Sequence, residues 1–271
     1  MGIVDGLVPD HLWRLFQLVA PEPPVRPQGG GRRRADERAV LAAILFVATS
    51  GCTWRKLPPV FGASWQTVHR RFTYWSKARV RAKLHRVVLD RLGANGELDW
   101  SRCAIDSVSV RAVKGGPLTG PNPADRGKLG SKIHVICDHS GLPISVGISG
   151  ANLHDSQALI PLMRGLPRIR SRYGSRRRRP AKLHADKGYD FDHLRNWLRR
   201  WLRGRGTVPR IARRGIESSG RLGRHRWVVE RTMSWLNGCR RLHRRYERTA
   251  DHFLACVSIA YTLICYRHTT N

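Results

Sequence analysis

Apolar residues in the first third of the chain recur at the spacing of helices. Asp36 is a typical N-cap for an apolar run that stops at Ser50, which predicts a helix over Arg38 to Thr49. Ser64 can cap a second helix that ends at Trp75, and the next segment continues with helical spacing to Leu92. The apolar positions of the second helix lie on one stripe: Trp65, Val68, Phe72 and Trp75. Residues 1–95 are therefore expected to form a small all-helical domain.

The pattern changes to that of strands after Leu98. Apolar and polar residues alternate over 102–111, and two further runs, 132–137 and 142–148, are joined by four turn residues as in a β-hairpin. Later segments alternate between strands at 181–185 and 207–211 and helices at 155–164, 192–203, 226–241 and 252–266. This order predicts an α/β domain over 96–271, a mixed sheet with flanking helices. The arginine-rich run from 168 to 179 is expected to be a solvated loop.

The charge balance gives information about the binding partner rather than about the fold. Fifty Lys and Arg residues against nineteen Asp and Glu give a formal charge of +31. Such an excess favours a polyanionic partner, and nucleic acid is the first candidate. A disordered basic protein would carry similar charge, but 41% of the residues are hydrophobic, which is enough for a folded core.

Cysteine usage and the apolar stretches bear on the compartment. The six cysteines are scattered, without the spacing of a zinc site, and are expected to be small buried residues in a reducing cytosol. Acidic residues near the N-terminus argue against a signal peptide, and the apolar stretches are too short to span a bilayer. We therefore expect a cytoplasmic protein that does not enter the membrane.

Three carboxylates occupy positions where catalysis is possible. Asp106 lies inside the first predicted strand, Asp186 closes a later strand just before Lys187 and Gly188, and Glu230 lies on a predicted helix. If they converge, they offer the oxygen ligands that Mg²⁺ prefers, and two ions could serve a phosphodiester displacement. Taken singly, each has an ordinary alternative: a surface acid, a turn residue, and a helical ion pair.

The motifs around these acids resemble the transposases of the IS5 group of bacterial insertion sequences. The matching segments are His184-Ala-Asp-Lys-Gly-Tyr-Asp190, Arg224-x-Arg226-x-x-x-Glu230-Arg231 and Arg240 to Arg248, with Gly30 to Arg32, Ala39 to Leu45, Gly51 to Pro58 and Trp65 to Phe72 near the N-terminus. The resemblance implies a ribonuclease-H-like fold with an Asp, Asp, Glu triad at Asp106, Asp186 and Glu230. It also implies two Mg²⁺ ions, with Mn²⁺ as an alternative. The related signature departs at Gly223, where Tyr is expected, and at Asn237, where Lys is expected.

The resemblance also implies a reaction and its partners. A metal-bound water would cut the phosphodiester at the end of the element, and the freed 3′-OH would attack target DNA. Partners would be the terminal inverted repeats and target DNA, bound by a dimer or larger assembly. Two alternatives stay open: a DNA-binding protein without catalysis, either a regulator or a decayed transposase, and a metal nuclease of the same fold.

Several basic side chains are candidates for contact with DNA. The helix that begins at Trp65 would read base edges, with its outward residues Gln66, His69, Arg70 and Arg71. The alternative is that this helix only packs within its domain. Arginine density without spaced polar partners indicates phosphate contact rather than base reading in the run 168–179 and at Arg240, Arg241, Arg244 and Arg245. Arg226 is a further candidate for contact with DNA.

Histidines and a further carboxylate could compete with the triad. His134 and the pair His154-Asp155 could suggest a metal centre, although they lack a second ligand at a suitable spacing. A structural role is the expectation for both histidines. Asp155 remains an alternative to one member of the triad.

Overall fold

The structure is a computed structural model of the 271-residue chain. It describes residues 2–22, 34–201, 206–216 and 219–269, and over 219–226 it describes the backbone alone. The predicted motif segment Gly30 to Arg32 lies outside the described residues.

The N-terminal part of the chain is helical, as the periodicity predicts. Its elements are α1 (Ile3–Leu7), α2 (Asp10–Gln17), α3 (Glu37–Ser50), η1 (Trp54–Lys56), η2 (Pro59–Phe61), α4 (Trp65–Lys77) and α5 (Val80–Asn95). The side chain of Asp36 accepts hydrogen bonds from the amides of Arg38 and Ala39 at the start of α3. Ser64 likewise accepts from the amide of Thr67 in α4. Between α4 and α5 the backbone turns at Arg79, whose φ is 53°, so these two helices are separate.

The second half of the chain forms a mixed sheet. Its strands are β1 (Cys103–Ala112), β2 (Gly120–Pro121), β3 (Leu129–Cys137), β4 (Pro143–Gly150), β7 (Lys182–Ala185), β8 (Val208–Ile211) and β9 (Arg244–Arg245). The strand order is β2-β3-β1-β7-β8, with β4 paired to β3 and β9 to β1. Pairing among β1, β3 and β4 is antiparallel, whereas β1, β7 and β8 run parallel. The predicted mixed sheet with flanking helices is confirmed.

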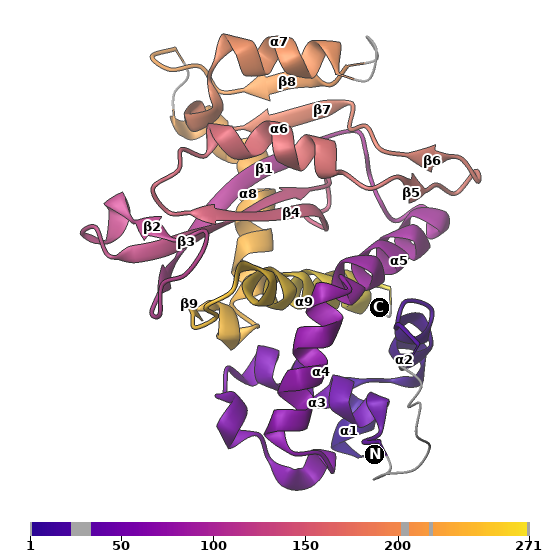
Figure 1. Ribbon diagram of the computed structural model, residues 1–271. Helices are drawn as coiled ribbons and strands as arrows, with labels where there is room; N and C mark the ends of the chain where they lie inside the picture. The colour runs from indigo at the N-terminus through magenta and orange to yellow at the C-terminus, as the bar shows by residue number, and fades with distance from the viewer. Residues whose placement is uncertain (1, 23–33, 202–205, 217–218, 270–271) are drawn as a thin grey trace.

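Helices cover both faces of this sheet. On one face α8 (Ser219–Leu236) contacts β1, β3 and β7, and on the other α6 (Ser156–Gly165) contacts β3 and β4. The helix α7 (Asp192–Arg200) lies next to α6 and packs against β8 (Figure 1). The sequence prediction placed the helix that became α8 over 226–241, so the structure begins and ends it earlier.

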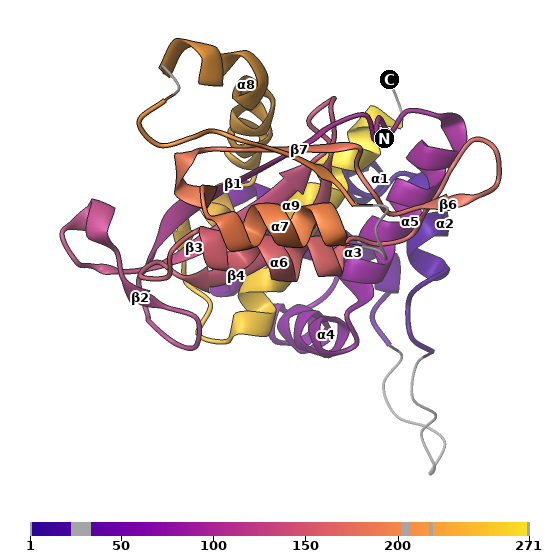
Figure 2. The ribbon, with the colours of Figure 1, turned by 90° about the horizontal axis from the view of Figure 1, so that it is seen from above.

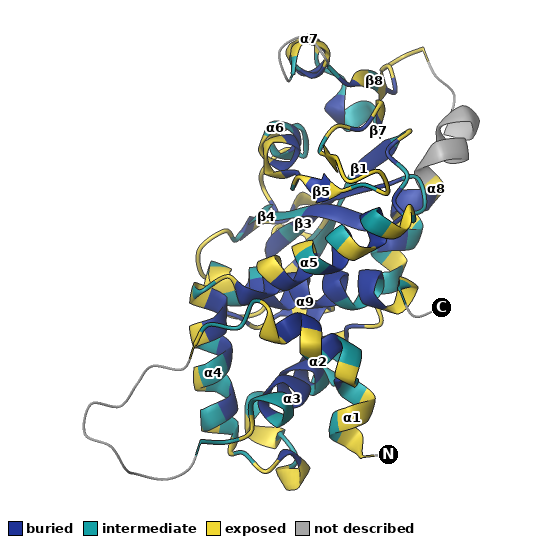
Figure 3. Cartoon of the chain, turned by 90° about the vertical axis from the view of Figure 1, so that its right-hand side faces the viewer, coloured by how far each residue is buried: buried dark blue, intermediate teal, exposed yellow. Residues whose placement is uncertain are grey.

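The last helix joins the two halves of the molecule. The helix α9 (Ala250–His268) contacts α3, α4 and α5 as well as β4 and α8. Figure 3 shows the buried residues concentrated in α3, α9 and the central strands. One hydrophobic core therefore runs from the N-terminal helices into the sheet. Within the described residues, no helix has the length and apolar character needed to cross a bilayer.

The arginine-rich run 168–179 differs from the sequence expectation. It forms an antiparallel hairpin of β5 (Ile169–Arg170) and β6 (Arg176–Arg177), and β5 packs against α5 (Figure 2). Ile169 supplies the reason, because this single apolar side chain is fully buried in the core.

Candidate active site

The register of the parallel strands β1 and β7 aligns Asp106 with Asp186, the residue that follows β7. The parallel pair β1 and β7 places Cys103 opposite Leu183 and Ala104 opposite His184, an offset of 80 residues. Asp106 and Asp186 keep the same offset, and the backbone at Asp186 is still extended, with φ −80° and ψ −177°. Side chains at one register of neighbouring strands point to the same face of a sheet. Two carboxylates far apart in sequence thus share a face because of strand register.

Local hydrogen bonds orient both aspartates. Asp106 is half-buried, and its Oδ1 accepts from the amide of Ser107 at 2.8 Å. Asp186 follows the last residue of β7 and caps the short helix η4 (Lys187–Tyr189), with its Oδ1 accepting from the amide of Gly188 at 2.8 Å. Gly188, two residues after Asp186, therefore supplies a backbone donor at the point where the strand ends.

Glu230 comes from the helix on the same face. Val108 and Val110, which share the face of Asp106 by strand alternation, line a cavity together with Met233 and Leu236 of α8. Val228 and Val229 anchor α8 in the core, while Glu230 itself is exposed. The elements that carry the three acids thus adjoin. Over the described part of the chain, no three His, Cys, Asp or Glu side chains are close enough together to hold a metal ion.

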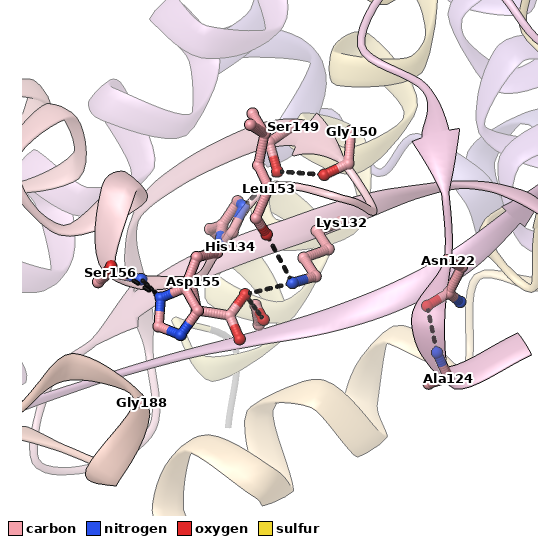
Figure 4. Close-up of polar contacts among 12 residues, drawn as sticks. Asn122, Ala124, Lys132, His134, Ser149, Gly150, Leu153, Asp155, Ser156 and Gly188 are labelled. Carbon is pink, nitrogen blue, oxygen red and sulfur yellow. Dashed lines mark hydrogen bonds and ion pairs between the residues drawn. The ribbon is translucent and has the colours of Figure 1, made fainter. Parts of the chain in front are cut away.

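Asp155 belongs to the opposite face of β1. Its Oδ1 accepts from the hydroxyl of Ser107 at 2.8 Å and lies 3.0 Å from the ammonium of Lys132. Figure 4 shows Lys132 reaching both Asp155 and the carbonyl of Leu153. Since Ser107 and Asp106 alternate along the strand, Asp155 does not share the row of Asp106 and Asp186. The sequence analysis did not predict Lys132 as a partner of Asp155. Alternation of side chains along β3 was the sequence signal that could have indicated this pair.

The two histidines near Asp155 are held by hydroxyl groups. His134 Nε2 lies 2.8 Å from Ser149 Oγ, and burial lowers the pKa of His134 to about 4. His154 Nδ1 lies 2.8 Å from Ser156 Oγ. Both contacts fit the structural role expected for these histidines.

Fewer side chains are exposed on the outer face of α4 than the sequence indicated. Gln66 and Arg70 are exposed, but His69 is half-buried, with its ring centroid 5.1 Å from that of Trp54 and 5.6 Å from that of His252. Burial is the main cause that lowers the pKa of His69. The expectation that His69 points outward is therefore wrong.

A groove runs beside α4. Its volume is about 900 Å³, and its lining includes Arg34, Ser64, Thr67, Arg70, Arg71 and Tyr74. Arg71 lies within this lining but is half-buried and 3.6 Å from the carboxylate of Glu37. Arg70 is exposed and donates to the hydroxyl of Thr67 at 3.4 Å, so it presents a cation on the wall of the groove.

The basic segment before α9 alternates between exposed and buried arginines. Arg240 and Arg244 are exposed. Arg241 is buried, donating to Glu247 Oε1 at 2.8 Å and to the carbonyl of Cys52 at 3.1 Å. Arg245 is fully buried and bonds to protein acceptors. The expectation that Arg241 and Arg245 contact phosphate is thus wrong for this structure, because their guanidinium groups are used internally. The side chain of Arg226 lies outside the described residues, so its role stays a prediction.

Comparisons with known proteins agree with this fold. Residues 8–85 match the family model "Putative transposase of IS4/5 family", and residues 100–265, more than half of the chain, match the "Transposase DDE domain". A Burkholderia cepacia protein, "Putative transposase for insertion sequence element IS402", is 45% identical over 152 residues, which cover 56% of this chain and 70% of that protein. "Transposase for insertion sequence element IS1106" from Neisseria meningitidis serogroup B is 30% identical over 139 residues, which cover 48% of this chain and 42% of that protein.

A solved structure shares the architecture at low identity. The piggyBac transposase synaptic complex with hairpin DNA has a TM-score of 0.50 and 10% identity, covering 98% of this chain and 74% of that chain. The likeness shows the ribonuclease-H-like fold alone. With the family matches and the relative at 45% identity, it follows that the chain belongs to the DDE transposases of bacterial insertion sequences, IS4/5 group, which are polynucleotidyl transferases.

Proposed function

We propose that Asp106, Asp186 and Glu230 are the catalytic carboxylates with which this transposase cuts DNA at the ends of its insertion sequence and joins them to a target. The observation that carries the proposal is the shared register row of Asp106 and Asp186 under the helix of Glu230. The amides of Ser107 and Gly188 orient the two aspartates.

The same three residues would hold the metal, for which their side chains must close together from the positions that they have in this structure. Carboxylate oxygens suit Mg²⁺ or Mn²⁺, and α8, which carries Glu230, contacts both β1 and β7. Two such ions, when bound, lower the pKa of a water and stabilise the attacking and leaving oxygens. The chain's own contribution is to fix the two aspartates on a rigid sheet, so that substrate phosphate meets pre-oriented ligands.

We assign DNA binding to those candidate residues whose side chains are exposed. We assign the reading of the terminal repeats to Gln66 and Arg70 on the groove beside α4, within the helical unit 1–95, and phosphate contacts to Arg240 and Arg244. Catalysis belongs to 96–271. The net charge of +31 supports a polyanionic substrate. Two ends must be held together for joining, so we propose a dimer or larger assembly on DNA.

Charge-neutral variants test the triad directly. Asp186→Asn and Glu230→Gln should reduce Mg²⁺-dependent cleavage of a duplex that carries the element's end to background, while gel-shift affinity stays near that of the parent. Asp192→Asn is the matched control, because this exposed residue at the start of α7 loses the same charge away from the row. Parent-like cleavage by Asp186→Asn would contradict the assignment.

The products separate the remaining alternatives. A parent protein that binds the duplex but cuts it with neither Mg²⁺ nor Mn²⁺ would indicate a DNA-binding protein without catalysis. Cleavage without joined products in the presence of target DNA would indicate a nuclease. Joined products are expected here.

A further inference from the structure

The segment 168–179, which contains the hairpin of β5 and β6, is densely charged and lies outside the candidate active site. Its exposed arginines are Arg168, Arg170, Arg172, Arg176, Arg177 and Arg179. Tyr173, near its tip, is 83% exposed. No acidic residue lies between 168 and 179 to offset this charge.

The fold holds these charges together against their repulsion. Arg170 and Arg176 are direct cross-strand partners, an arrangement that is destabilising for like charges. Asp90 on α5 counters it by accepting from the amide of Arg170 at 2.7 Å and from Arg176 Nη1 at 3.0 Å. One carboxylate thus secures both strands of the hairpin and neutralises one of its guanidinium groups.

A close approach to α5 fixes the position of the hairpin. A Cβ at Gly93 would collide with the carbonyl oxygen of Arg170 and would lie 2.9 Å from Ile169 Cγ2. Ile169 itself is fully buried. Only glycine at position 93 lets the hairpin sit this deeply, so its arginines are displayed on a fixed support rather than on a free loop.

Four of the arginines keep their guanidinium groups available. Arg168, Arg170, Arg172 and Arg177 have no carboxylate or hydrogen-bond acceptor for those groups among the residues that the structure describes. Three of them line a concavity of about 220 Å³ next to the C-terminal end of α5: Arg170, Arg172 and Arg177. Exposed guanidinium groups clustered on one small hairpin can each form paired hydrogen bonds to phosphate oxygens.

We propose that this hairpin binds the phosphate backbone of duplex DNA without reading its sequence. The proposal rests on the proposed function only in taking DNA as the partner. Between β5 and β6 the side chains are Ser, Arg, Tyr and Ser with a glycine, so the amides of Asn and Gln that read base edges are missing from the turn. The guanidinium groups could read guanine, but no spaced polar side chains accompany them, so we assign them to phosphates, whose contacts position DNA without specifying its sequence.

The hairpin contacts DNA away from the reacting phosphodiester. It precedes β7, whereas Asp186 follows that strand, so the two lie at opposite ends of four extended residues, roughly 13 Å. The hairpin therefore raises the affinity for DNA and leaves the chemical step at saturating DNA unchanged.

The test is the double variant Arg172→Gln and Arg177→Gln in the full chain. Both side chains are exposed and lack an internal partner in the described structure, so folding is expected to be retained. Its matched control is Arg14→Gln with Lys83→Gln, two exposed cations on other elements. Affinity is measured by fluorescence anisotropy for two duplexes of equal length, one with the element's end and one of scrambled sequence, at several salt concentrations.

The loss of two phosphate contacts should lower the slope of log affinity against log salt by about 1.8. If the affinity at 1 M salt is unchanged, the affinity at 0.1 M salt then falls about sixtyfold. The loss should be equal for both duplexes, and the control should keep the parent's slope. An unchanged slope, or a loss confined to the element's end, would overturn the proposal. Absence of cleavage by the parent would refute the proposed function but leave this measurement intact.

Discussion

Arg244 and Arg245 give a direct test of the difference between an exposed and a buried arginine. Both were candidates for contact with DNA, but only Arg244 is exposed. Arg245 Nε donates to the carbonyl of Glu247 at 2.9 Å, and Nη1 donates to Ser131 Oγ at 2.7 Å. Further bonds reach the carbonyls of Pro117 and Leu118, at 2.8 and 3.0 Å. The prediction is that Arg245→Met destabilises the fold whereas Arg244→Met does not.

The size of the effect follows from those bonds. A hydrogen bond to a charged group contributes about 1.5–3 kcal/mol. Pro117 and Leu118 are exposed, so water can replace the guanidinium there, and we count as lost only the bonds to Ser131 and Glu247. The expected loss is about 3–6 kcal/mol, and it lowers the Tm by roughly 10 °C in a chain of this size. An exposed substitution such as Arg244→Met should stay within about 0.5 kcal/mol.

Thermal melting followed by circular dichroism measures the stability of both variants, and anisotropy with a duplex measures the affinity of the folded proteins. Arg245→Met should melt early yet bind DNA normally once folded. Arg244→Met should melt with the parent and bind DNA more weakly. The reasoning is refuted if Arg245→Met melts with the parent and loses affinity as Arg244→Met does.

Three further predictions concern a titration, a cap and the groove. Burial lowers the pKa of His85 to about 4, so between pH 6.5 and 4 the unfolded chain takes up a proton that the folded protein does not, and stability falls as pH falls. His85→Gln should reduce that fall, by at most about 3 kcal/mol in urea titrations, and equal pH profiles would contradict it. Asp36→Ala should cost about 1 kcal/mol in the same assay because α3 loses its cap, and no loss would show that Asp36 is dispensable. Arg70→Ala should weaken discrimination between the element's end and scrambled DNA more than Arg71→Ala, because Arg71 is paired with Glu37, and the reverse order would exclude the groove as the reader.

Local structure could be predicted from the sequence because neighbours in the chain decide it. The caps at Asp36 and Ser64 lie within three residues of the amides that they satisfy. The stripe on α4 is confirmed at Val68, Phe72 and Trp75, which are buried. Helical and strand periods are likewise properties of short windows. The α/β class followed from these signals alone.

Tertiary structure decided which polar residues can act. The sequence could propose Asp106 and Asp186, but it is the parallel pairing of β1 and β7 that puts them on one row. Asp155 was an alternative to one member of the triad, and its hydrogen bond with Ser107 places it on the other face. Which carboxylates share a face depends on strand register, and register is a relation between segments distant in the chain.

The arginines show the same division. Composition alone determined that this protein carries an excess of positive charge, +31, and hence favours a polyanion. It could not separate Arg245, which is buried, from Arg244, nor show that Asp90 and Gly93 seat the arginine hairpin on α5. The ion pair of Asp90 with Arg176 joins residues 86 positions apart, and windows of neighbouring residues carry no information about such contacts.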